Sequence, residues 1–127
     1  MERLRELLTG LMCSRVYRTE PHHRRDQPWY YNQVVIGIAP AGPHRLLTLV
    51  QELERLGGRA RERELRFGPR PLDIDILLYG SLVLHAADLY VPHPRMHRRP
   101  FVLEPLLEIA PHWNDPRTGV PWRLYLP

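Results

Sequence analysis

Apolar residues recur along the chain with two periods, 3.6 and 2, and the change from one to the other predicts a small α+β domain. Leucines at helical spacing predict a first helix over residues 2–12. Alternation predicts strands over residues 14–18 and 30–38, and a polar segment rich in Pro and His separates them. The first half of the chain therefore has the order helix, strand, strand.

The second half begins with a helix that Pro43 opens at a favoured first-turn position and that Gly57-Gly58 is expected to end. After an Arg-rich loop, a strand is predicted over residues 72–79, with a short β segment near residues 82–85 as its expected partner. A buried helix over residues 100–109 and an irregular tail follow. This order matches a ferredoxin-like split β-α-β sandwich, with helices on an antiparallel sheet, that lacks its first strand.

The composition indicates one globular domain over residues 1–127, since 43% of the residues are hydrophobic and 25% are charged. No apolar stretch is long enough to cross a membrane, and the charged first residues do not resemble a signal peptide. The single cysteine, Cys13, excludes an internal disulfide and is typical of the reducing cytoplasm. We therefore expect a cytoplasmic protein without a membrane partner.

All 18 basic residues are arginine, and the net charge is +4. The absence of lysine excludes a Schiff-base enzyme, a P-loop NTPase and a protein kinase, because each needs a lysine in its site. An anion that binds this chain is therefore expected to bind arginine.

The strongest chemical signal is a pair of carboxylates, Asp73 and Asp75, on one face of the strand predicted over residues 72–79, about 7 Å apart. Neighbouring carboxylates repel each other, and a divalent cation such as Mg²⁺ is the usual reason to keep them. Arg66 and Arg70 precede the pair, and polyphosphate chemistry requires such arginines beside metal-binding carboxylates. The alternative is the solvated outer face of an edge strand.

Several motifs, in order along nearly all of the chain, resemble the 6-hydroxymethyl-7,8-dihydropterin pyrophosphokinases of folate biosynthesis. The most specific are Arg66-Phe67-Gly68-Pro69-Arg70-Pro71-Leu72-Asp73-Ile74-Asp75, Val91-Pro92-His93-Pro94-Arg95-Met96 and Arg99-Pro100-Phe101-Val102-Leu103. The resemblance implies a cytoplasmic transferase with a nucleotide-binding site. Its members transfer the β,γ-pyrophosphoryl group of ATP to the hydroxymethyl group of the pterin and release AMP.

The resemblance also implies a role for particular residues. Two Mg²⁺ ions would bind Asp73 and Asp75, which together with Arg59 and Arg70 form the implied catalytic set. The implied ATP-binding residues are Gln51, Glu54, Arg59, Arg70, His93 and Arg99. The implied pterin-binding residues are Thr19, Pro21, Tyr30, Asn32 and Phe101. Three arginines of the implied lid, Arg61, Arg63 and Arg66, stay without a role, because a mixed charge run is also typical of a solvated loop.

Family members begin with an apolar strand, absent here, whose place in the sheet lies between residues 30–38 and 72–79. A start codon assigned too late is the explanation we favour. A true truncation, in which the sheet re-pairs or borrows a strand, and an inactive relative are the alternatives. We otherwise expect a monomer.

Two other functions stay open at this stage. A basic chain with this plan is compatible with an RNA-binding module, although carboxylates on a strand would repel phosphate without metal, so no nucleic-acid partner is expected. A metal-dependent nuclease or another Mg²⁺ phosphotransferase would use the same aspartates.

Overall fold

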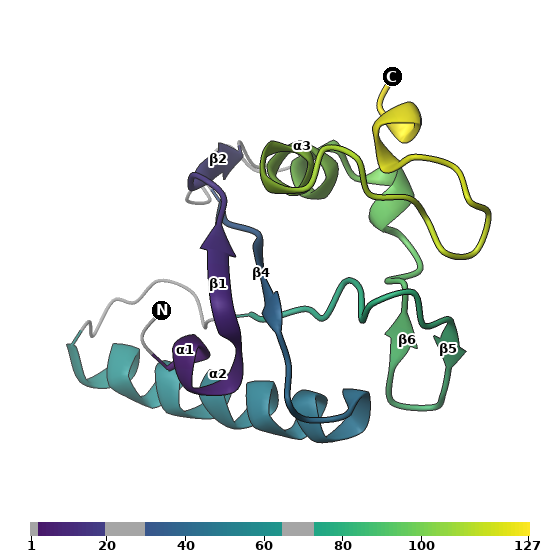
Figure 1. Cartoon of the computed structure of the whole chain (residues 1–127). Coiled ribbons are helices and arrows are strands. Elements are labelled where there is room, and N and C mark those ends of the chain that lie inside the picture. Colours follow the sequence, from purple (N-terminus) through teal and green to yellow (C-terminus); the bar gives the residue numbers. More distant parts are fainter. Residues whose placement is uncertain (1–2, 20–29, 65–72) are drawn as a thin grey trace.

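The computed structural model describes residues 3–19, 30–64 and 73–127, and for residues 30 and 58–64 it describes the backbone only. A narrow antiparallel ribbon runs between two helices, α2 (Pro43–Glu64) across one end and α3 (Pro100–Ile109) at the other (Figure 1). Short antiparallel sheets and helices make this an α+β protein, as the sequence predicts.

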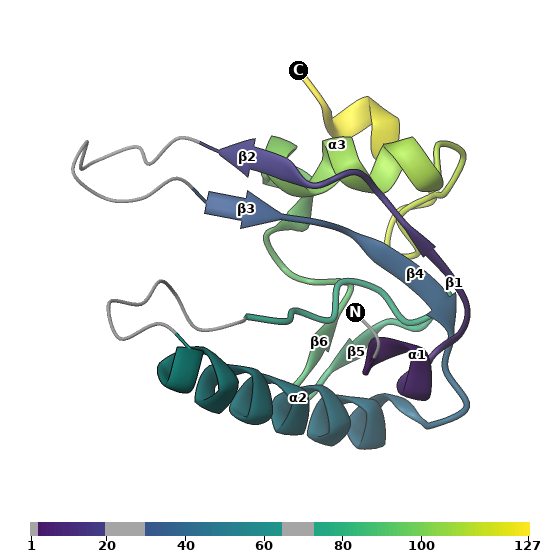
Figure 2. The same cartoon turned by 90° about the vertical axis from the view of Figure 1, so that its left-hand side faces the viewer.

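The ribbon consists of two pairs of strands in succession. β1 (Thr9–Cys13) pairs with β4 (Val35–Ile38), and β2 (Tyr17–Thr19) pairs with β3 (Tyr30–Asn32). Buried Ser14 joins the two pairs: its backbone N–H donates to the Val34 carbonyl (2.8 Å) and its Oγ accepts from the Val34 N–H (3.0 Å). Figure 2 shows the resulting bent ribbon. The strand predicted over residues 30–38 is thus present but interrupted at this joint, between β3 and β4. Of the strand predicted over residues 14–18, only residues 17 and 18 lie in a strand, β2, because residues 14–16 form the joint.

The first predicted helix is wrong beyond its first turn. α1 spans only Leu4–Leu7, and residues 9–12, which were predicted to be helical, belong to β1 (Thr9–Cys13). Gly10 has φ +62°, a left-handed conformation that a right-handed helix cannot contain. The backbone of this segment pairs with β4 instead, so tertiary pairing overrides the leucine periodicity.

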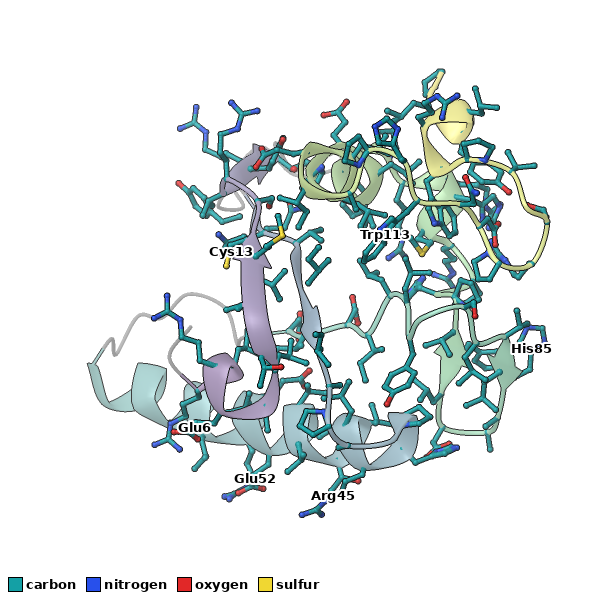
Figure 3. All side chains as sticks on the ribbon, viewed as in Figure 1. Glu6, Cys13, Arg45, Glu52, His85 and Trp113 are labelled. Carbon is teal, nitrogen blue, oxygen red and sulfur yellow. The ribbon has the colours of Figure 1, made fainter. Side chains whose placement is uncertain are left out.

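Helix α2 begins at Pro43, as predicted, and buries Leu46 and Val50. Its opposite face, with Arg45 and Glu52, points away from the ribbon (Figure 3). The predicted end at Gly57-Gly58 is wrong, because the helix continues to Glu64. Each glycine costs about 1 kcal/mol in a helix, and the Arg and Glu residues that follow are good helix formers.

The strand predicted over residues 72–79 is also wrong within its described part, because residues 73–79 have no strand partner there. Two of its backbone groups bind elsewhere: the Ile74 N–H donates to Glu54, and the Leu77 carbonyl accepts from the His93 N–H. The expected partner segment instead forms a hairpin of its own, in which β5 (Leu84–His85) pairs with β6 (Tyr90–Val91).

The helix predicted over residues 100–109 is confirmed as α3. Its apolar side meets two 3-10 helices, η1 (Met96–Arg98) and η2 (Trp122–Tyr125). The buried core there consists of Val34, Met96, Leu103, Leu106, Ala110 and Trp122. The tail has no strand beyond a single bridge between Asn114 and Pro121. Within the described ranges, no helix combines the length and apolar character needed to cross a bilayer.

Candidate active site

Asp73 and Asp75 lie on an extended segment with both side chains exposed to solvent, and Ile74 between them is half-buried. The Ile74 N–H donates to Glu54 Oε1 on α2 (2.8 Å). Among the described residues, neither aspartate makes a hydrogen bond or an ion pair, so their oxygens are available to an external ligand. Glu54 therefore fixes the backbone from which both carboxylates project.

We expect Glu54→Ala to free this segment. The variant loses a hydrogen bond to a charged acceptor, worth roughly 1.5–3 kcal/mol, so the Ile74 amide should exchange with solvent at least about tenfold faster. Hydrogen exchange followed by NMR measures this. Glu52→Ala on the outer face of the same helix is the matched control and should leave Ile74 unchanged. Equal exchange in wild type and Glu54→Ala would contradict the role of Glu54.

His93 is held close to the carboxylate segment. Its backbone N–H donates to the Leu77 carbonyl (2.7 Å), and its Nδ1 accepts from the Arg95 backbone N–H (3.1 Å). Because Nδ1 accepts, the proton of the neutral ring lies on Nε2. Partial burial and the charge of Arg99 lower the pKa of His93, against the opposing charge of Asp75. The ring is therefore a neutral hydrogen-bond donor through Nε2 at pH 7.

Arg99 connects the two predicted halves of the site. It is the residue before the first turn of α3, and its guanidinium carbon lies 5.7 Å from the centre of the Phe101 ring, a cation–π distance. Its charge also acts on His93. Arg99, which is expected to contact ATP, thus lies between His93, also expected to contact ATP, and Phe101, which is expected to contact the pterin.

A hydrogen bond joins the Asn32 side chain to the backbone of Phe101, and a proline within α3 explains why it forms. Pro105 has no N–H, so the Phe101 carbonyl, four residues earlier, has no helical donor. Asn32 Nδ2 donates to that carbonyl instead (2.7 Å). Among the described residues, the second amide hydrogen and Oδ1 of Asn32 have no partner, so they are available to a flat heterocycle. Thr19 lies on the adjacent strand, opposite residue 30.

Comparison with known proteins decides the family. Residues 1–111 match the family model for 7,8-dihydro-6-hydroxymethylpterin-pyrophosphokinase. The chain belongs to this pyrophosphokinase family. The resemblance carried by the sequence motifs is therefore confirmed.

Three relatives are 40–44% identical to this chain. Two are named 2-amino-4-hydroxy-6-hydroxymethyldihydropteridine pyrophosphokinase: that of Synechocystis (44% over 107 residues, 84% of this chain and 53% of the relative) and that of Bacillus subtilis (44% over 103 residues, 81% and 60%). The third is the mitochondrial folate synthesis bifunctional protein of Arabidopsis thaliana (40% over 125 residues, 95% and 22%). The chain thus spans 53–60% of the two relatives named as pyrophosphokinases.

The structure brings part of the expected pyrophosphokinase site together. Asp75, His93 and Arg99 interact electrostatically, and Asn32 contacts Phe101 directly. Gln51 is exposed on α2, one turn before Glu54. Pro21 and Arg70 lie outside the described residues, and of Tyr30 and Arg59 only the backbone is described. The side chains of the lid arginines Arg61, Arg63 and Arg66 also lie outside the described part.

Sequence reasoning missed Arg95 and Pro105 as contributors to this candidate site, and it gave Glu54 a different role. The Arg95 backbone N–H sets the His93 tautomer, a role that no residue type signals. Glu54 was expected to contact ATP, but within the described residues it supports the carboxylate segment. Pro105 did carry a signal, because a proline inside a helix frees the carbonyl four residues before it.

Proposed function

We propose that this protein transfers the pyrophosphoryl group of ATP to 6-hydroxymethyl-7,8-dihydropterin in tetrahydrofolate biosynthesis and releases AMP. The observation that carries this proposal is a pair of exposed carboxylates, Asp73 and Asp75, that make no hydrogen bond or ion pair with another described residue. Glu54 holds the backbone between them, and Asp75 and Arg99 both act electrostatically on His93. The family membership and the printed names of the relatives support the substrate pair.

The donor set fits Mg²⁺. Its preferred ligands are hard oxygens, and it needs only one or two carboxylates because it keeps water and takes phosphate oxygens as well. Asp73 and Asp75 offer exposed carboxylate oxygens, and no group of three or more His, Cys, Asp or Glu side chains competes within the described part of the chain. When bound, Mg²⁺ would neutralise phosphate charge and make the pterin hydroxyl easier to deprotonate.

The chain's own residues position the two substrates. The pterin hydroxyl releases its proton to solvent and its oxygen forms a bond to the β-phosphorus. The bond from that phosphorus to the bridging oxygen on the α-phosphate breaks, and AMP leaves with that oxygen. His93 donates its Nε2–H to a phosphate oxygen, and Arg99 adds a fixed positive charge on the same side. Asn32 offers its free amide edge to the pterin, and the Phe101 ring, which is 40% exposed, provides a stacking surface.

The remaining expected site residues and the partners of the protein complete the proposal. Arg59 and Arg70 bind the phosphates when the site closes, and Gln51 contacts the nucleoside. Thr19, Pro21 and Tyr30 line the pterin side. The protein works as a monomer in the cytoplasm, and it binds neither nucleic acid nor membrane.

One assay tests this function. Protein is incubated with ATP, Mg²⁺ and reduced hydroxymethylpterin, and the nucleotides are separated. We expect AMP in an amount equal to the pterin consumed, and none when pterin is omitted or EDTA is added. ADP, or no turnover, would contradict the proposal. RNA binding that weakens with salt and persists without Mg²⁺ would favour the RNA-binding alternative instead.

A further inference from the structure

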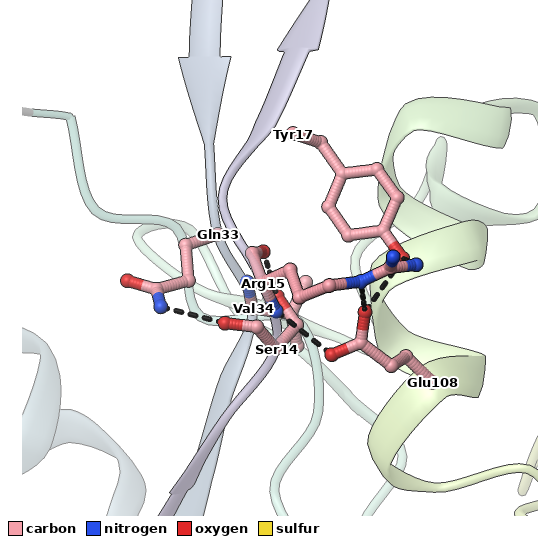
Figure 4. A network of polar contacts seen from close by, with 6 residues as sticks. All are labelled: Ser14, Arg15, Tyr17, Gln33, Val34 and Glu108. Atoms are coloured by element: carbon pink, nitrogen blue, oxygen red, sulfur yellow. Dashed lines mark hydrogen bonds and ion pairs between the residues drawn. The ribbon is translucent and has the colours of Figure 1, made fainter.

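We propose that Glu108, Arg15 and Tyr17 form a clamp that positions the pterin-side residues, although none of the three belongs to the expected site. This inference rests on the proposed function. Figure 4 shows the clamp between the ribbon and the last turn of α3. Glu108 Oε1 accepts from Arg15 Nε (2.7 Å) and from the Tyr17 hydroxyl (2.8 Å), and Oε2 accepts from the Arg15 backbone N–H (2.7 Å).

The clamp is built for geometry rather than for stability. Arg15 is 79% exposed, and exposed ion pairs contribute little to the free energy of unfolding. Both carboxylate oxygens are nevertheless used, and one partner is a backbone N–H, so the carboxylate is fixed relative to the strand itself. Hydrogen bonds from Arg15 and Tyr17 lower the pKa of Glu108, which therefore stays ionised. Arg15 also lies over the Tyr17 ring, 5.5 Å from its centre.

A second tether holds the other end of the same helix. Asn32 Nδ2 binds the Phe101 carbonyl in the first turn of α3, and Glu108 lies about 10 Å farther along the axis. Tyr17 and Asn32 are direct partners across the ribbon. Each tether therefore includes one member of this cross-strand pair, and together they fix the angle of α3 to the ribbon. That angle sets where the Phe101 ring lies relative to Asn32 and Thr19.

Releasing Glu108 should loosen the pterin side and spare the ATP side. For Glu108→Ala we expect the pterin KM to rise about tenfold, with the ATP KM within about twofold and kcat within about threefold of wild type. Glu108→Gln keeps one acceptor oxygen but turns an NH₂ group toward a donor, so it should rescue the pterin KM only in part. Tyr17→Phe should give a smaller increase, because it removes one bond of three.

Arg117→Ala is the matched control. It also breaks an arginine–carboxylate contact, with Asp115, but one between residues of the C-terminal segment and not between the ribbon and α3. It should lower the urea midpoint without changing the pterin KM. If Glu108→Ala behaved like this control, or raised both KM values together, the clamp would be merely structural and the inference wrong. Absence of AMP formation by wild type would contradict the proposed function, whereas wild-type turnover with an unchanged pterin KM in Glu108→Ala would overturn the clamp alone.

Discussion

Replacing Asp75 with alanine is expected to abolish turnover and to leave the fold intact. The carboxylate is exposed and makes no hydrogen bond with another described residue, so its removal should cost the folded state little. Under the proposed function, its loss would remove a ligand of the Mg²⁺ that binds the phosphates. Such a cation contributes several kcal/mol, which corresponds to a decrease in kcat of at least about 1,000-fold. AMP formation under saturating ATP and pterin measures the effect.

Two further variants make this result specific. Asp75→Asn keeps the size of the side chain but gives up the negative charge, and we expect nearly the same loss. Asp88→Ala removes another exposed aspartate, which contacts His44 beside the β5–β6 hairpin, and should retain wild-type activity. Circular dichroism and thermal unfolding should be unchanged in all three. Full activity of Asp75→Ala would refute the metal assignment.

Elements with local signals were predicted correctly. Pro43 and the apolar run of residues 100–109 set the starts of α2 and α3, because a proline in the first turn and a buried apolar face act within a few residues. Two predictions that depended on a distant partner failed. Residues 9–13 pair with β4, whereas residues 73–79 have no strand partner among the described residues. The pattern of apolar positions in each segment does not tell whether a distant strand will pair with it.

The candidate site divides in the same way. The motifs pointed to candidate site residues such as Asp73, Asp75 and His93, because a motif is defined by the spacing of residues along the chain. The contacts that arrange these residues join distant segments: the Glu54 carboxylate reaches the Ile74 N–H, and the Leu77 carbonyl reaches the His93 N–H. Such contacts follow from tertiary packing, which a single sequence does not encode as a pattern.

The largest loss of stability is expected from a carboxylate far from the aspartate pair. Asp115 is fully buried, and four hydrogen bonds reach its two oxygens. Three come from Arg117, through its backbone N–H (2.9 Å), Nε (3.0 Å) and Nη2 (2.9 Å), and one comes from the Tyr125 hydroxyl (2.8 Å). Tyr125 belongs to η2, whose Trp122 is fully buried in the core. Asp115 thus holds η2 to the loop of residues 115–117 that precedes it.

Asp115→Ala should lower the free energy of unfolding by about 3 kcal/mol, because it leaves the guanidinium of Arg117 and the hydroxyl of Tyr125 without their acceptor. The midpoint of urea unfolding at pH 7 measures the loss. Asp88→Ala, at an exposed position, should change the midpoint hardly at all. Equal midpoints for both variants would contradict the structural role of Asp115.

The same carboxylate should affect how the free energy of unfolding decreases at acid pH. Burial by itself would raise the pKa of Asp115, but the hydrogen bonds from Arg117 and Tyr125 outweigh it and hold the pKa below its usual value. The unfolded chain therefore binds this proton more readily, at about pH 4. The contribution is complete above that pH and disappears as the pH falls through the lower folded value. Asp115→Asn should flatten this decline in the free energy of unfolding between about pH 5 and pH 2, the interval that surrounds the unfolded pKa and the lower folded one. If the free energy of unfolding from urea titrations fell with acid as in wild type, another carboxylate would control the decline.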